Sequence, residues 1–196
     1  AGYRVAGYSS PHLIRYNERV RIDGAELDDD TLAAAFAAVE AARREVPLTY
    51  FEFGTLAAMW CFMQRTVDLA VMEVGLGGRL DAVNVFEPDC AVVTAVDIDH
   101  IEFLGNSRDS IGLEKAGIFR AGVPAICGDC NPPQTLLQHA MTIGADLRLR
   151  ERDFRLIRHG DRWDFEGASR FPELPLPALR GEFQLDNAAS ALAAVE

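Results

Sequence analysis

The segment "DLAVMEVGLGGRLDAVNV", Asp68 to Val85, indicates how this chain folds. It opens as an apolar strand, interrupts that strand with the carboxylate of Glu73, and continues into a glycine-rich loop. A carboxylate at the end of a buried strand, beside a loop with few side chains, is typical of a site for a metal ion and a phosphate. The segment therefore predicts a sheet that binds a ligand at the carboxyl ends of its strands.

The composition limits the classes of protein to consider. With 196 residues, 49% of them hydrophobic and 25% charged, the chain can form one globular domain with a sizeable core. No apolar run reaches the roughly 18 residues of a membrane-spanning helix. A net charge of -11 argues against nucleic acid and anionic membrane surfaces as partners, because both need basic patches. Cys127 and Cys130 form a lone CxxC, a redox pair or half of a zinc site at most, and the cysteines indicate a reducing cytoplasm.

Four short apolar runs do not alternate with polar residues, so each is predicted to be a strand buried on both faces of a parallel sheet. These runs are 3–8, 69–74, 90–96 and 123–127. Helical patterns lie at 28–46, 51–65, 107–120 and 133–144. Strands that alternate with helices predict an α/β fold, a mostly parallel sheet flanked by helices.

The pattern changes at Ala145, where polar and apolar residues begin to alternate. We predict a small antiparallel β segment near 145–166. Residues 171–183 contain three prolines, which predicts an extended connector, and 185–196 begins a helix. We expect the whole chain, 1–196, to form one domain.

Reactive side chains follow the predicted strands and would meet at one edge of a parallel sheet. Ser10 follows the first run, Glu73 ends the second, His100 follows the third and Asp129 the fourth. Hydroxyl and carboxylate oxygens are ligands that suit Mg²⁺.

Each of these residues also has a purely structural interpretation. Ser10 could cap a turn, Glu73 could pair with Arg79, and His100 could be a surface residue. The "GLGG" sequence could form only a tight turn, since it is not the dinucleotide-binding fingerprint. Their shared position at strand ends favours a function, because independent turns have no reason to collect such chemistry.

Lys115 is unusual because it lies in an otherwise apolar helical pattern. Ile111 and Phe119, four residues before and after it, offer no ion pair, which weakens the interpretation as a solvated face. A buried lysine is costly unless it is paired or chemically altered.

Five segments together resemble the dihydrofolate synthase/folylpolyglutamate synthase family of the Mur ligase superfamily. They are "YSSPHLIRYNERVRIDG" (8–24), "LTYFEF" (48–53), "MEVGLGGRLDAVNV" (72–85), "DHIEFLGNSRDSIGLEKAGIFR" (99–120) and "GEFQLDNAA" (181–189). The segments occur in the family's order across essentially the whole chain, so the match is much more specific than any single motif.

The resemblance implies a central ATPase domain of a ligase that forms amide bonds. In this family ATP phosphorylates a substrate carboxylate, and the amine of L-glutamate attacks the acyl phosphate. The implied substrates are dihydropteroate and folates, with ATP as co-substrate and two Mg²⁺ ions as cofactors. We expect a cytoplasmic monomer without nucleic acid or membrane partners.

The resemblance also implies roles for particular residues. Ser10 and Glu73 would bind one Mg²⁺ and His100 the second. Lys115, carbamylated by CO₂, would act in catalysis together with His100 and Glu73. The pterin site would include Thr49, Tyr50, Phe51, Glu52, Leu80, Asp81 and Ala82. Asn187 would contact the nucleotide.

The sequence also departs from the family's pattern. A glycine-rich phosphate loop would precede the first residue and a carboxy-terminal domain would follow the last. We therefore expect a piece truncated at both ends and inactive alone. Val83 and Ser9 stand where the family commonly has Thr. The alternative functions are another Mur-type amino-acid ligase and a non-catalytic pterin-binding domain.

Overall fold

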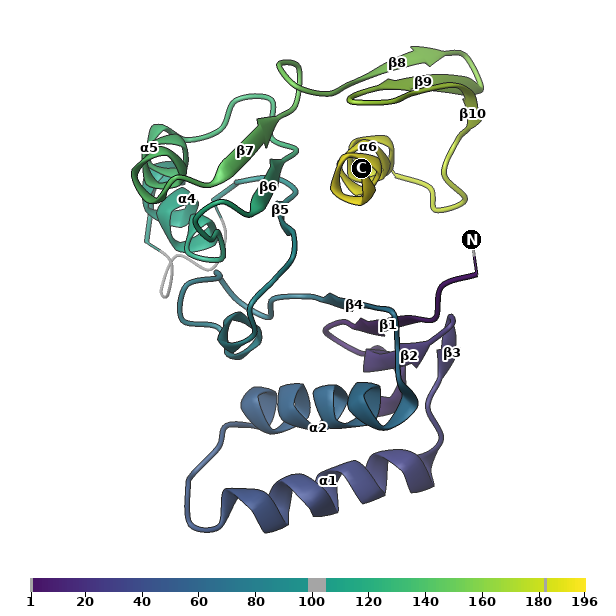
Figure 1. The fold of residues 1–196 in the computed structure, drawn as a ribbon, viewed down its shortest axis with the longest axis vertical. Coiled ribbons are helices and arrows are strands. Elements are labelled where there is room, and N and C mark those ends of the chain that lie inside the picture. The colour runs from purple at the N-terminus through teal and green to yellow at the C-terminus, as the bar shows by residue number, and fades with distance from the viewer. Residues whose placement is uncertain (1, 99–104, 182) are drawn as a thin grey trace. The chain divides into compact units, whose positions relative to one another are not determined.

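The computed structural model describes residues 2–98, 105–181 and 183–196 (Figure 1). Its strands and helices form two compact units, Ala1–Phe86 and Glu87–Glu196. None of the helices within the described ranges combines the length and the apolar character needed to cross a membrane. The single domain predicted over 1–196 stays a prediction.

The first unit contains a four-stranded sheet in the order β3-β2-β1-β4. Its strands are β1 (Val5–Tyr8), β2 (Val20–Ile22), β3 (Ala25–Glu26) and β4 (Leu69–Met72). β1 pairs in parallel with β4 and antiparallel with β2. The hairpin of β2 and β3 was not among the predicted elements. Its turn uses Asp23 and Gly24 at positive φ, 52° and 80°, an Asp-Gly pair that favours such hairpins.

Two helices of this unit confirm the helices predicted at 28–46 and 51–65. They are α1 (Asp29–Arg43) and α2 (Tyr50–Arg65), and the shorter 3₁₀ turns are η1 (Tyr16–Arg19) and η2 (Ala82–Val85). Helix α1 begins after Asp28, whose carboxylate accepts a hydrogen bond from the Thr31 N–H at 2.7 Å. The core between the helices and the sheet includes Ala6, Tyr8, Leu32, Ala35, Ala57, Ala58 and Phe62.

The prediction that these strands are buried on both faces is wrong for β4. Val5 pairs with Leu69 and Gly7 with Val71, so these residues share the face opposite the helices. Leu69 is 49% and Val71 57% exposed, and Ala70 on the opposite face is exposed too, because β4 is the edge strand of this sheet. Glu73, one residue beyond β4, is exposed as well and is not the buried carboxylate that the sequence predicted.

The second unit contains a parallel sheet in the order β5-β6-β7. Its strands are β5 (Ala91–Val93), β6 (Pro124–Cys127) and β7 (Asp146–Leu149), and the helices that connect them are α4 (Arg108–Ala116) and α5 (Gln134–Ile143). The apolar faces of both helices pack against the sheet. This core includes Ile111, Ala116, Leu136 and Ala140 with Ala125 and Cys127.

The other face of that parallel sheet is covered by α6 (Gln184–Val195). A separate antiparallel sheet, β10-β9-β8, packs on α6 through Phe154, Trp163 and Phe165 (Figure 1). Its strands are β8 (Arg155–His159), β9 (Arg162–Glu166) and β10 (Arg170–Pro175). Helices on both faces of a parallel sheet, with an antiparallel segment attached, confirm the predicted α/β class.

The boundaries of the antiparallel segment differ from the predicted range, 145–166. Residues 146–149 join the parallel sheet as β7, and 170–175 form a strand where an extended connector was predicted. Among the described strands, β10 is an edge strand that pairs with β9 alone, and its register shifts between Phe171 and Leu174, so its prolines need not donate to a ladder.

Candidate metal and substrate site

Ser10 and Glu73 meet at the carboxyl ends of β1 and β4. The pairing of these parallel strands continues beyond their ends, where the Glu73 N–H donates to the Tyr8 carbonyl at 2.9 Å. The Ser10 N–H then donates to Glu73 Oε2, also at 2.9 Å. Within the described ranges, neither Glu73 Oε1 nor the Ser10 hydroxyl has a hydrogen-bond partner, and Glu73 forms no ion pair. A hydroxyl and a carboxylate oxygen thus remain available on adjacent strand ends.

The chemistry of these two donors fits a hard divalent cation. Mg²⁺ takes oxygen ligands, is commonly held by one or two protein groups, and fills its shell with water and phosphate oxygens. His100, the predicted ligand of a second ion, lies outside the described residues. In the part of the chain that is described, no three His, Cys, Asp or Glu side chains form a complete metal site.

The glycine loop after Glu73 is organised by Asp81. Asp81 Oδ2 accepts hydrogen bonds from the N–H groups of Gly75 (3.1 Å) and Leu76 (3.0 Å), and Oδ1 accepts one from Val83 (2.9 Å). Of the predicted pterin contacts in this loop, Asp81 thus has both oxygens engaged with the backbone. Leu80 is 80% exposed and Ala82 is half-buried at the start of η2.

The two segments predicted to bind the pterin lie against each other. A Cβ at Gly75 would meet ring atoms of Phe51 at 2.6 to 3.0 Å, so the Phe51 ring packs directly on the backbone of the glycine loop. The Phe51 ring also lies near the Tyr8 ring, and the two ring centroids are 5.8 Å apart. Only glycine permits this packing, which joins segment 49–52 to the loop that leads to Leu80.

Within 49–52, two side chains serve the start of α2. The Thr49 N–H donates to Glu52 Oε2 at 2.6 Å, and the Glu52 N–H donates to Thr49 Oγ1 at 3.2 Å. This reciprocal capping box satisfies the first turn of the helix, and the hydrogen bond from Thr49 lowers the pKa of Glu52. Tyr50, 63% exposed, and Phe51 therefore offer the side chains of this segment that can contact a ligand.

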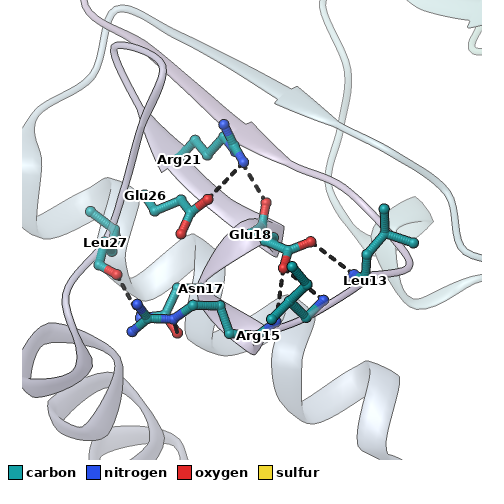
Figure 2. A network of polar contacts seen from close by, with 8 residues as sticks. Leu13, Arg15, Asn17, Glu18, Arg21, Glu26 and Leu27 are labelled. Atoms are coloured by element: carbon teal, nitrogen blue, oxygen red, sulfur yellow. Dashed lines mark hydrogen bonds and ion pairs between the residues drawn. The ribbon is translucent and has the colours of Figure 1, made fainter.

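The loop after Ser10 is held by residues that the sequence pattern did not reveal. Glu18 accepts hydrogen bonds at 2.8 Å from the backbone N–H groups of Leu13, Ile14 and Arg15 (Figure 2). These bonds lower the pKa of Glu18 to about 2. The loop thereby turns the side chains of Leu13 and Ile14 outward, where they are 89% and 90% exposed.

Asn17 and Arg19 secure the same loop from its other end. Asn17 Nδ2 donates to the Leu27 carbonyl at 2.8 Å (Figure 2), and Arg19 Nε donates to His12 Nδ1 at 2.8 Å. Both Asn17 and Arg19 are buried, at 6% and 8% exposure. The segment "RYNER" contains three charged residues. The sequence alone does not reveal that one of them, Arg19, is buried.

In the second unit, Lys115 occupies the last turn of α4 and is half-buried. The helix ends at Ala116, earlier than the predicted 107–120, because Gly117 is its C-cap. No acidic side chain of the described ranges lies within ion-pair distance of the Lys115 amine. Asn187 is exposed in the first turn of α6, beside Asp186, whose carboxylate pairs with Arg150 at 2.9 Å.

Asp129, at the end of β6, serves the fold. Its Oδ2 accepts from Arg108 Nη2 (2.8 Å) and from the Val96 N–H (2.9 Å), and its Oδ1 accepts from the Asn131 N–H (2.8 Å). This carboxylate, with a side chain only 10% exposed, ties the ends of β5 and β6 to α4 and is not available to a metal ion.

Comparison with known proteins gives a consistent result. The chain matches the Mur ligase middle domain over residues 28–195. It is 48% identical to the dihydrofolate synthase/folylpolyglutamate synthase of Escherichia coli (strain K12), over all of this chain and 46% of that protein. This chain therefore spans about half the length of the curated relatives it matches.

Solved structures agree with the sequence comparison. The structure of E. coli FolC in complex with DHPP and ADP matches with a TM-score of 0.95 and 48% identity, over 100% of this chain and 46% of that one. A bifunctional folylpolyglutamate synthase/dihydrofolate synthase with Mn, AMPPNP and L-glutamate bound matches with a TM-score of 0.92 and 45% identity, over 100% of this chain and 47% of that one.

Proposed function

This chain belongs to the Mur ligase family, and from this premise we propose that it is part of a dihydrofolate synthase/folylpolyglutamate synthase. In the proposed reaction, a carboxylate oxygen of dihydropteroate or of a folate attacks the γ-phosphorus of ATP, which releases ADP and leaves an acyl phosphate. The amine of L-glutamate then attacks the acyl carbon, phosphate leaves, and an amide bond and a proton are formed. The observation that carries the proposal is the junction of Ser10 with Glu73 at the ends of β1 and β4.

Ser10 and Glu73 are proposed to hold one Mg²⁺ ion. The Ser10 N–H fixes Glu73 Oε2, which orients Oε1 and the Ser10 hydroxyl as the two protein ligands. Bound there, Mg²⁺ would neutralise charge on the phosphate oxygens during phosphoryl transfer. His100 is proposed to bind a second ion, as the family resemblance implies. The relative solved with Mn, AMPPNP and L-glutamate supports a divalent metal ion, a nucleotide and glutamate as ligands.

Lys115 is proposed to be carbamylated. Its neutral amine would add to CO₂, forming an N–C bond and releasing one proton, so that a cation becomes an anion. This step needs a neutral amine, and Lys115 is half-buried with no acidic side chain of the described ranges paired to its amine. The carbamate would then orient His100 or a metal-bound water.

The pterin is proposed to bind where Phe51 packs on Gly75, since this contact joins both predicted segments. Tyr50, Phe51 and Leu80 would supply apolar contacts there. Thr49, Glu52 and Asp81 would shape the site through the capping box and the glycine loop. Asn187, exposed on α6, is proposed to contact the nucleotide. The relative solved with DHPP and ADP supports a pterin and a nucleotide as ligands.

The protein is further proposed to act as a monomer in the cytoplasm, as the family resemblance implies. Sedimentation of the intact protein with and without substrates would test the oligomeric state.

The experiment that tests the function is an assay of the intact protein with ATP, Mg²⁺, L-glutamate and dihydropteroate. We expect ADP, phosphate and dihydrofolate in equal amounts. Folate polyglutamates should form when a reduced folate replaces dihydropteroate. Formation of a product from a cell-wall precursor instead, or pterin binding without ATP turnover, would contradict the proposal.

A further inference from the structure

Arg19 is a buried cation without an acidic partner in the part of the chain that is described. It is 8% exposed, and no carboxylate within those ranges lies at ion-pair distance from it. Its guanidinium lies between two aromatic rings, with Cζ 5.7 Å from the centroid of Tyr16 and 5.6 Å from that of Tyr50. Burial of a charge is unfavourable unless specific contacts compensate, so the position of Arg19 requires an explanation.

The hydrogen bond from Arg19 to His12 determines the tautomer of His12. A guanidinium has five N–H donors and no acceptor, so in the 2.8 Å contact from Arg19 Nε the His12 Nδ1 atom must be the acceptor. An accepting Nδ1 carries no proton. The proton of the neutral imidazole is therefore on Nε2, for which the described ranges provide no partner.

The surroundings of Arg19 hold this arrangement in place. The Ser9 N–H donates to the Arg19 carbonyl at 2.9 Å, which ties the start of the loop to the last residue of η1. Glu18 fixes the loop between Leu13 and Arg15 through three backbone N–H groups (Figure 2). Tyr50, one of the two rings that enclose the guanidinium, is the first residue of α2. The loop after β1, the turn η1 and the start of α2 thus all contribute contacts around the pair formed by His12 and Arg19.

We propose that Arg19 is a positioning residue that locks His12 in the Nε2–H tautomer. His12 lies two residues beyond Ser10, in the loop that Glu73 holds. It thereby becomes a hydrogen-bond donor at the strand-end site. Its acceptor would be an anionic oxygen, a carboxylate or phosphate oxygen of the substrate, and this last step rests on the proposed function. The opposite tautomer would present a lone pair at Nε2, which repels such an oxygen.

Nitrogen NMR of the intact protein, labelled with ¹⁵N-histidine, tests the tautomer directly. At slightly alkaline pH an ordinary imidazole is neutral, and the spectrum distinguishes the protonated from the unprotonated ring nitrogen. A His12→Gln variant identifies the His12 signals among those of the four histidines. We expect the proton on Nε2 in the wild type. A proton on Nδ1, or a mixture of both tautomers, would overturn the proposal without any variant of Arg19.

Two substitutions of Arg19 and one matched control extend the test. Arg19→Met removes the donor, and Arg19→Lys removes the planar fork that fits between the two rings, so both should give mixed tautomers. Arg21→Lys changes a neighbouring exposed arginine that pairs with Glu26 at 2.8 Å and should keep the wild-type spectrum. Unchanged His12 signals in Arg19→Met would show that Arg19 does not set the tautomer.

The ligand step has a separate readout in the ligase assay. Arg19→Met and His12→Phe should each lower kcat/KM by roughly tenfold, the effect of one hydrogen bond to a charged group, with no additional loss when they are combined. If the losses in kcat/KM of the two single variants add in the double variant, Arg19 does not act through His12. Absence of ligase activity in the wild type would refute the proposed function and leave the NMR result standing.

Discussion

The Ser10 N–H donates to Glu73 Oε2 at 2.9 Å, although the two residues lie 63 positions apart. They meet because β1 and β4 are parallel neighbours whose carboxyl ends share one edge. The bond satisfies one carboxylate oxygen, and neither the other oxygen nor the Ser10 hydroxyl has a partner within the described ranges. Strand pairing thus brings these two residues together.

Replacing Lys115 by Ala should nearly abolish ligase activity of the intact enzyme. The variant removes the amine that would carry the carbamate, while Ala at the end of α4 favours the helix. Added short carboxylates, such as acetate, should restore part of the rate, because they can replace the missing anion. Full activity in Lys115→Ala, or a bare amine in electron density of the active enzyme at high bicarbonate, would exclude the carbamate.

Replacing Gly75 by Ala should weaken pterin binding selectively. The new Cβ would force the Phe51 ring away from the glycine loop. We expect the KM for the pterin substrate to rise several-fold while the KM for ATP stays unchanged. In a Phe51→Ala background the same substitution should have little further effect, because the ring that it displaces is absent. Equal effects of Gly75→Ala in both backgrounds would show that the contact does not shape the site.

Glu18 should make stability depend on pH at the acidic end. Its pKa is about 2 in the folded protein and 4.5 ordinarily, so its contribution is present above about pH 4.5 and is lost as the pH falls through about 2. Glu18→Gln should therefore unfold at a lower urea concentration than the wild type at neutral pH. The difference in free energy of unfolding between the two should shrink from pH 4.5 downward. A difference that is constant over this range would contradict the role assigned to the carboxylate.

The order of strands and helices could be predicted because apolar runs and helical periodicity are local properties of the sequence. The meeting of Ser10 and Glu73 followed from that order, since parallel strands bring their carboxyl ends together. The strand at 170–175 was missed because its prolines indicated a connector, and only its position at a sheet edge makes them tolerable.

The partners of charged side chains could not be predicted in the same way. Asp81 and Asp129 looked similar to Glu73 in the sequence, yet their oxygens are engaged by loop N–H groups and by Arg108. The burial of Arg19 depends on Tyr50, 31 residues further along the chain, so no local pattern reveals it. Which partner a charged side chain has depends on the folded arrangement of the backbone, not on the spacing of residues in the sequence.

Binding of Mn²⁺ to the intact protein in the presence of AMPPNP tests the central claim most directly, with the bound ion followed by electron paramagnetic resonance. Glu73→Gln keeps the size of the side chain and an oxygen that can accept from Ser10, but it removes the charge. The matched control is Glu45→Gln, since Glu45 is exposed and has no hydrogen bond or ion pair within the described ranges. We predict that Glu73→Gln weakens Mn²⁺ binding at least roughly tenfold, with the circular dichroism spectrum unchanged, while Glu45→Gln binds like the wild type. Wild-type affinity for Mn²⁺ in Glu73→Gln would contradict the assignment of this strand-end pair as the metal site.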